Sequence, residues 1–310
     1  MSYRIRSGFP LTAEVRRIAA EELNAALEWL SRVNDKPDKA LHETRKLLKN
    51  VRALLRLVRS GAKDFVRKEN ARYREAAALL AGPRQAGALI ETVDRLAKGL
   101  HDSRHRKVVT SARENLLAHR AGVLSAEAND AATQAAKACR AGIKRLGRLK
   151  LPDQPEEAAD ILAEGAARTL RRARRALKAA RKAGEEEAFH DLRKATKAHL
   201  AHLALLREFW PSPVKTRRAT VGALAEKLGE LQDILVLRGL LRDGGPAVGS
   251  FAETGKFDGL CARSERRLRK ACLNEAAELF RDSPKRPARR VARKARRDLA
   301  EAVPVDTVDA

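Results

Sequence analysis

The sequence predicts an all-α protein made of two duplicated four-helix bundles, and three observations support this prediction. The chain has 310 residues, of which only 4% are aromatic. Ala, Leu, Arg and Glu dominate and favour helices, whereas the β-branched and aromatic residues that favour strands are sparse. Apolar residues recur at helical spacing, and one basic motif occurs twice, 148 residues apart.

Turn residues divide the first half of the chain into six helices. Gly8 and Pro10 end a short extended lead-in. Thr12 is predicted to cap the first helix, because an acidic residue lies downstream of it. A turn at residues 34–38 precedes the second helix, and Gly61 supplies its stop signal. The helices predicted from these signals cover approximately residues 12–32, 39–60, 64–81, 84–100, 105–121 and 124–146.

The clearest boundary in the chain is the segment Lys150-Leu-Pro-Asp-Gln-Pro155, because its two prolines cannot continue a helix. We therefore divide the chain into an N-terminal bundle, residues 1–150, and a C-terminal bundle, residues 151–310. The second half is predicted to contain a long helix from about Glu156 to an acidic turn at 185–187, helices ending near Phe209 and Arg242, a loop at 243–249, and a helix at 257–281.

The motif that organises the sequence begins at His42. A helix advances about 100° per residue, so offsets of 0, 3, 4, 7, 10 and 14 fall within an arc of about 120°. One stripe of this helix therefore carries His42, Arg45, Lys46, Lys49, Arg52 and Arg56. The opposite side carries apolar residues that can face a core, namely Leu47, Val51, Leu54, Leu55 and Val58.

A second copy of the motif begins at His190 and repeats the spacing with Arg193, Lys194 and Lys197. At the offset of 148 residues, Arg52 meets Leu200, so the second stripe is shorter. An internal duplication of a helical unit is the simplest account of this repeat. The helix before the second copy carries a stripe of its own at the same six offsets: Arg168, Arg171, Arg172, Arg175, Lys178 and Lys182.

A basic stripe opposite an apolar one is by default a solvated helix face. Two observations favour a binding surface instead. Like charges three and four residues apart repel one another, and a solvated face normally intersperses Glu to cancel that repulsion. In addition, each copy of the motif has a histidine at its head. We therefore interpret the stripes as cation arrays for a polyanion, with both histidines as ligands.

The charge balance supports a polyanionic partner, because 65 Lys and Arg against 40 Asp and Glu give a formal net charge of +25. Nucleic acid is the alternative partner, since a strongly basic chain is typical of nucleic-acid-binding proteins. Few aromatic residues are present for base stacking, however, and no helix-turn-helix or zinc module is visible. The basic run at residues 285–297 is predicted to be either a tail that contacts nucleic acid or a final helix that joins the basic surface.

No sequence motif predicts catalysis. The chain has no P-loop, no zinc-protease motif and no acidic cluster for two metals, so we expect neither enzymatic activity nor a metal or other cofactor. Asp233 is interpreted as orienting a basic side chain. His199 and His202 fall on the apolar side of their helix and are interpreted as structural.

Cysteine usage and hydropathy indicate a cytoplasmic protein. Cys139, Cys261 and Cys272 are odd in number and scattered, which predicts reduced, packed thiols. The N-terminus lacks the apolar segment of a signal peptide, and no stretch is apolar and long enough for a membrane span. We therefore expect no membrane partner.

The two His-x-x-Arg-Lys-x-x-Lys runs resemble the CHAD family, the conserved histidine α-helical domains. Residues 3–6, residues 11–18 and the segment Leu228-Gly-Glu-Leu-Gln-Asp233 are similar to further parts of the family, so the resemblance covers nearly the whole chain. It implies two four-helix bundles related by a pseudo-twofold axis, with the His-bearing helices lining a basic central surface. It also implies binding of inorganic polyphosphate and, for many members, association with polyphosphate granules.

We therefore expect a stand-alone CHAD protein that binds inorganic polyphosphate without catalysis, in the cytoplasm or at polyphosphate granules. Generic binding of DNA or RNA through the basic surface is the alternative. The expected polyphosphate-binding residues are His42, Arg45, Lys46, Lys49, Arg52, Arg56, Arg168, Arg171, Arg175, His190, Arg193, Lys194 and Lys197.

Overall fold

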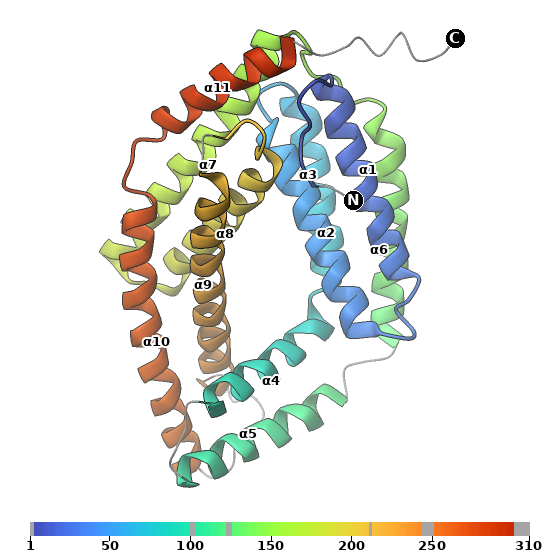
Figure 1. Cartoon of the computed structure of the whole chain (residues 1–310). Coiled ribbons are helices and arrows are strands. Elements are labelled where there is room, and N and C mark those ends of the chain that lie inside the picture. Colours follow the sequence, from blue (N-terminus) through green and yellow to red (C-terminus); the bar gives the residue numbers. More distant parts are fainter. Residues whose placement is uncertain (1–2, 99–102, 122–125, 211–212, 243–250, 301–310) are drawn as a thin grey trace.

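The computed structural model describes residues 3–98, 103–121, 126–210, 213–242 and 251–300. Every regular element in these ranges is an α-helix, which confirms the all-α class (Figure 1). The helices are α1 Leu11–Leu30, α2 Pro37–Leu57, α3 Lys63–Leu79, α4 Gly82–Lys98, α5 Ser103–Ala121, α6 Ala126–Leu146, α7 Pro155–Ala183, α8 Glu186–Leu205, α9 Val214–Arg242, α10 Phe251–Leu279 and α11 Lys285–Ala300.

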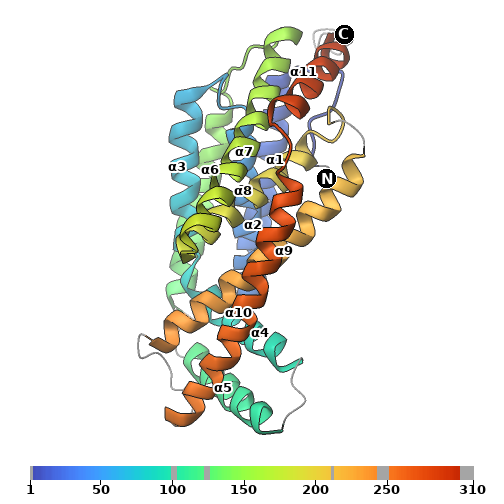
Figure 2. The same ribbon diagram turned by 90° about the vertical axis from the view of Figure 1, so that its left-hand side faces the viewer.

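Four helices of the first half pack side by side as a bundle. α1 contacts α2 and α6, and α3 contacts the same two helices. The remaining pair, α4 and α5, forms a hairpin that leaves this bundle and packs on α9 and α10 (Figures 1 and 2). In the second half, α7 packs against α8 and α11, and α9 packs between α8 and α10.

The two halves also meet where the C-terminal ends of α2 and α8 lie against the first half of α7. α2 contacts both α7 and α8. The approach of α7 to α2 is close because Gly165 has no side chain: a Cβ there would lie 2.1 Å from the Leu57 carbonyl oxygen. Buried residues of both halves belong to one continuous apolar cluster. The division at residues 150 and 151 and the internal duplication therefore stay predictions.

The N-terminal lead-in is tied to both halves. The Ile5 amide donates to the Leu205 carbonyl at 3.0 Å, and the Gly8 amide donates to the Asp298 carbonyl at 3.2 Å. Glu14, whose side chain is 1% exposed, accepts hydrogen bonds from the Arg6 amide and from the guanidiniums of Arg6 and Arg17. Burial alone would raise the pKa of Glu14, but these hydrogen bonds outweigh it and lower the pKa to about 2.

Three local predictions need correction or refinement. Thr12 is not the cap of the first helix: Pro10 occupies that position, and the Thr12 amide donates instead to Asp153 at 2.7 Å, which ties α1 to the α6–α7 connection. Helix α10 begins six residues before the predicted start at 257. The basic run at 285–297 is helical and lies in α11, whose apolar residues, such as Val291, are buried.

The three cysteines are free and buried, as predicted. Burial raises the pKa of Cys139 to about 11 and the pKa values of Cys261 and Cys272 to about 12. All three thiols are therefore protonated at neutral pH and serve as small apolar core residues.

Candidate functional site

Helix α2 buries the side that the sequence predicts to be apolar. Val51, Leu54, Leu55 and Val58 are fully buried, while Leu47 is partly buried. Pro37 near the first helical position and the amphipathic spacing explain why the helix begins where it does and which side it buries. The cations of the stripe consequently emerge on the other side or along its edges.

The α2 cations divide into two groups. The side chains of His42, Lys46 and Lys49 are exposed, and Lys46 pairs with Glu43 at 2.9 Å. Two arginines turn toward α3 instead. The Arg45 guanidinium donates to the Ala77 carbonyl, and Nε of Arg52 donates to Oδ1 of Asn70 at 3.2 Å. Arg45 and Arg52 therefore also hold α2 against α3.

The second copy of the motif, on α8, also divides into two groups, but here the histidine belongs with the arginine. His190 and Arg193 lie toward α9, where His190 Nδ1 donates to Gln232 Oε1 at 2.6 Å. Lys194 and Lys197 are exposed, and Lys194 pairs with Glu187 at 3.3 Å and with Asp191 at 3.2 Å. These acids come from the helix's own first turns, so they partly neutralise the second stripe.

The stripe of α7 lies beside α8. Arg168 and Arg171 both donate to Glu164, at 3.3 and 2.9 Å, while Arg172 reaches Asp191 of α8 at 3.9 Å. Arg175 is exposed and makes no side-chain hydrogen bond or ion pair with any described residue. The Nη1 atom of Arg168 is buried without a hydrogen-bond partner.

The structure brings cations of two stripes together at the C-terminal end of α2. Burial, and after it the nearby charges of Arg52 and Arg172, together lower the pKa of Arg56 to about 10. Arg56 has no ion pair within the described residues. A partly buried guanidinium beside another cation and without a carboxylate favours an anion at this point.

A buried histidine near Arg56 and Arg168 joins three helices. The Nε2 atom of His202 in α8 donates to the Ala53 carbonyl of α2 at 3.0 Å, and Nδ1 accepts from the Thr169 hydroxyl of α7 at 2.8 Å. His202 is 1% exposed, and burial is the first cause that lowers its pKa to about 3, with Arg56 and Arg168 adding to the effect. The structural interpretation of His202 from the sequence is therefore confirmed, and the imidazole is neutral at pH 7.

His199 and Asp233 also match their interpretations. The His199 ring is fully buried against Trp210 and Phe280, with ring centroids 5.5 and 5.9 Å away. Asp233 accepts from Arg95 of α4 at 3.0 Å, so it orients a basic side chain. No group of His, Cys, Asp and Glu within the described ranges has the arrangement of a metal site.

The sequence did not indicate one cluster of arginines. A cleft of about 970 Å³ lies where α7, α9, α10 and α11 meet, and Arg174, Arg181, Arg217, Arg286 and Arg290 line it. A second cleft, of about 310 Å³, lies between α4, α9 and α10. No predicted polyphosphate-binding residue lines either of these two clefts. The only sequence signal for the larger cleft was the basic run at 285–297, because its other arginines come from distant segments.

Comparisons with known proteins identify the fold family. The family profile described as CHAD domain matches residues 4–242. The solved structure of PptA from Streptomyces chartreusis is similar with a TM-score of 0.57 and 16% identity, over 88% of this chain and 100% of that one. The crystal structure of the CHAD domain from the plant Ricinus communis is similar with a TM-score of 0.53 and 15% identity, over 94% of each chain.

A search of curated protein sequences returned no match. Within the described ranges, none of the helices has the length and apolar character needed to cross a membrane. The family profile spans well over half of the chain, and the solved structures share its fold. The chain therefore belongs to the CHAD domain family.

Proposed function

We propose that this protein binds inorganic polyphosphate, without catalysis, on a surface formed by cations of α2, α7 and α8. The observation that carries the proposal is the position of Arg56. It is partly buried, it lies near Arg172 of α7, and it has no ion pair within the described residues. An anion that bridges α2 and α7 would relieve the repulsion between these guanidiniums.

The chemistry of the exposed stripe residues fits a flexible chain of phosphates. Arg offers a planar fork of donors that matches phosphate oxygens, and Lys supplies a compact charge. Residues three or four apart on a helix place successive cations about 5–6 Å apart, which is comparable to the spacing of phosphates along an extended chain. The exposed cations Lys49, Arg175 and Lys197 come from three different helices and extend the site beyond Arg56.

A matched pair of variants tests this site. The first combines Lys49→Ala, Arg175→Ala and Lys197→Ala, and the second combines Lys285→Ala, Arg289→Ala and Arg293→Ala. Both variants remove three positive charges from exposed positions. If the overall charge of the protein alone determined binding, the two variants would lose the same affinity for polyphosphate. We expect the first variant to lose at least about tenfold in affinity for long-chain polyphosphate, because it removes direct charge-assisted contacts. The second should lose less.

Fluorescence titration with labelled polyphosphate measures both affinities, and circular dichroism checks that both variants remain helical. We left Arg45 and Arg52 out of the substitutions because each also contacts α3. Equal losses in the two variants would contradict a localised site.

Binding of nucleic acid through the same charge is the second candidate, and the net charge of +25 is the observation that favours it. Competition separates the two. Labelled polyphosphate is displaced with unlabelled polyphosphate or duplex DNA at equal phosphate concentration and near-physiological salt. We expect polyphosphate to compete better. Equal competition would favour binding by charge alone.

The proposal also includes the place of action. A fluorescent fusion of the whole chain is expected to concentrate at polyphosphate granules in cells that accumulate the polymer and to spread through the cytoplasm in cells that do not. A fusion whose distribution ignores the polymer would contradict granule recruitment.

A further inference from the structure

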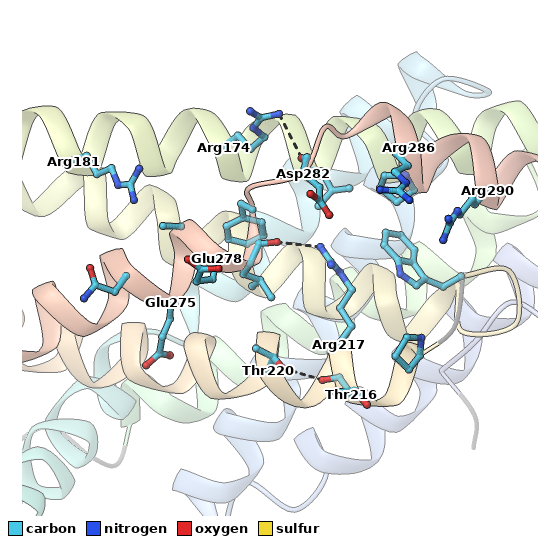
Figure 3. Close-up of a pocket in the computed structure, with 18 residues that line it drawn as sticks. Arg174, Arg181, Thr216, Arg217, Thr220, Glu275, Glu278, Asp282, Arg286 and Arg290 are labelled. Atoms are coloured by element: carbon cyan, nitrogen blue, oxygen red, sulfur yellow. Dashed lines mark hydrogen bonds between the residues drawn. The ribbon is translucent and has the colours of Figure 1, made fainter.

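The larger cleft carries an inference that goes beyond polyphosphate binding by the stripes. Its walls come from α7, α9, the end of α10 and the start of α11, and its volume is about 970 Å³ (Figure 3). The family profile ends at residue 242, so α10 and α11 lie beyond the matched segment. Volumes of about 300–1,000 Å³ are usual for small-molecule sites.

Arginines from three helices line the cleft. Arg286 and Arg290 lie one turn apart on α11, Arg217 comes from α9, and Arg174 and Arg181 come from α7. In Figure 3, Arg286 and Arg290 descend from α11, and Arg217 rises from α9 with its guanidinium directed at the Leu279 carbonyl. Arg286 and Arg290 are exposed and have no side-chain hydrogen bond or ion pair within the described part of the chain. Two adjacent guanidiniums without a carboxylate are suited to receive phosphate oxygens.

Two of the three described acidic residues that line the cleft pair with cations outside it. Glu275 pairs with Lys227, and Glu278 lies 3.7 Å from Arg281. Neither of these cations lines the cleft. Asp282 is the remaining described acid of the lining, which also includes five arginines, and its charge acts on Arg217. The cleft therefore has an excess of positive charge for a ligand.

Arg217 is held in place at the floor of the cleft. Its Nη2 donates to the Leu279 carbonyl at 3.3 Å, and its Nε donates to Nε2 of His199 at 3.5 Å. The guanidinium also lies 6.0 Å from the Trp210 ring. These contacts leave Nη1 of Arg217 for a ligand and keep the guanidinium in one orientation before binding.

The rest of the lining combines apolar side chains with threonines, an asparagine and the three acids. Its apolar part comes from Trp210, Pro213, Leu279, Phe280 and Pro287, of which Trp210 and Phe280 are largely buried and present only a small area. Inorganic polyphosphate has no apolar body to use this surface, whereas a nucleotide presents a flat base to it. Several guanidiniums together match a ligand with more than one phosphate.

We propose that this cleft is a second ligand site, which binds a nucleoside polyphosphate. The phosphates contact Arg217, Arg286 and Arg290, and the base and sugar occupy the part lined by Trp210, Pro213 and Pro287. The site is separate from the stripe surface, because no stripe residue lines it.

The two tryptophans of the chain allow a site-specific measurement. Trp210 lines the cleft, whereas Trp29 lies on α1 and is not part of it. A Trp29→Phe background leaves Trp210 as the single tryptophan reporter. In this background, ATP without magnesium is expected to change the emission of Trp210 in a saturable way. No saturable change would overturn the proposal.

Matched substitutions on α11 then locate the phosphate contacts. We expect Arg286→Ala with Arg290→Ala to weaken ATP binding roughly tenfold or more. Arg289→Ala with Arg293→Ala changes the same charge on the same helix, but neither residue lines the cleft, so ATP affinity should change less than about threefold. Equal losses, or no loss in either variant, would refute the assignment. Thermal unfolding checks that both variants stay folded.

Two further ligands test the chemical class. Tripolyphosphate has the charge without the base, and adenosine has the base without the charge. We expect both to bind more weakly than ATP. Tripolyphosphate as tight as ATP would show that the site is only an anion site, and adenosine as tight as ATP would exclude the arginine contacts. The Lys49→Ala, Arg175→Ala, Lys197→Ala variant should keep full affinity for ATP.

Discussion

At the scale of single residues, four histidines fall into two kinds: two lie at the start of the basic runs, and two are buried in the core. His42 and His190 head the two basic runs, and His190 donates to Gln232. His199 and His202 are buried and neutral, and His202 connects α8 to α2 and α7. A buried neutral imidazole makes stability depend on pH, because the unfolded chain binds a proton that the folded chain does not.

We predict that the protein loses stability as the pH falls from about 7 to 5. Burial is the main reason that the pKa of His202 falls from 6.5 to about 3 in the folded state, and burial also lowers the pKa of His199. Because the folded pKa is depressed, the contribution is complete above pH 6.5 and is lost progressively toward pH 3. At pH 5, His202 alone lowers the free energy of unfolding by roughly 2 kcal/mol relative to pH 7.

Urea titrations of the wild type and of His202→Leu at pH 7 and pH 5 measure this effect. The substitution removes one of the two buried histidines, so the difference in unfolding free energy between the two pH values should shrink by about 2 kcal/mol. Leucine is the natural choice because Leu54 stands at the matching position 148 residues earlier. A variant with the same pH dependence as the wild type would mean that His202 is not the group responsible.

At the scale of helices, the contact between α7 and α2 depends on one residue without a side chain. A Cβ on Gly165 would lie 2.1 Å from the Leu57 carbonyl oxygen, and backbone at a helix crossing cannot move aside as a flexible side chain can. Near this crossing, Thr169 of α7 and Ala53 of α2 both bond His202. The distance between Arg56 on α2 and Arg172 on α7 therefore depends on the same helix contact.

We therefore predict that Gly165→Ala lowers the free energy of unfolding by about 3 kcal/mol, because it forces the two helices apart. Gly222→Ala is the matched control. Gly222 lies inside α9, and a Cβ there would meet nothing within 4 Å. That change should raise the free energy of unfolding by about 0.5–1 kcal/mol, because alanine favours the helix. Denaturant unfolding measures both, and a stable Gly165→Ala protein would mean that the crossing is not tightly packed.

The two interpretations of the basic run at 285–297 are resolved at the same scale. Residues 285–300 form a helix whose buried side, with Ala288, Val291, Ala295 and Leu299, packs on α7. It is therefore not an extended tail. That its cations join the basic surface stays a prediction.

At the scale of the whole molecule, the number of phosphates that the cations neutralise together determines how strongly salt acts on a polyanion complex. We predict that log affinity for long-chain polyphosphate falls steeply with log salt, with a slope steeper than about −3, because several phosphates are neutralised at once. Titrations at four salt concentrations measure the slope. A value near −1 would mean that one or two phosphates are held, which contradicts an extended site.

The sequence alone determined the helical class, most helix boundaries and the side that α2 buries. These depend on residues close together in the chain: the spacing of Val51, Leu54 and Leu55, and the prolines at 152 and 155. Helix propensity and turn chemistry act over one or two turns, so they can be inferred from a short window. The repeated motif also indicated which helices carry the cations.

Only the tertiary structure decided which cations meet and which serve another helix. Arg56 lies near Arg172, whereas Arg45 and Arg52 turn to α3, although all three α2 residues share one predicted stripe. Arg217 and Arg286 line one cleft, although they belong to different helices far apart in the chain. Periodicity determines the side of a helix on which a residue lies, but the neighbour on that side depends on how the helices pack, which no local pattern encodes.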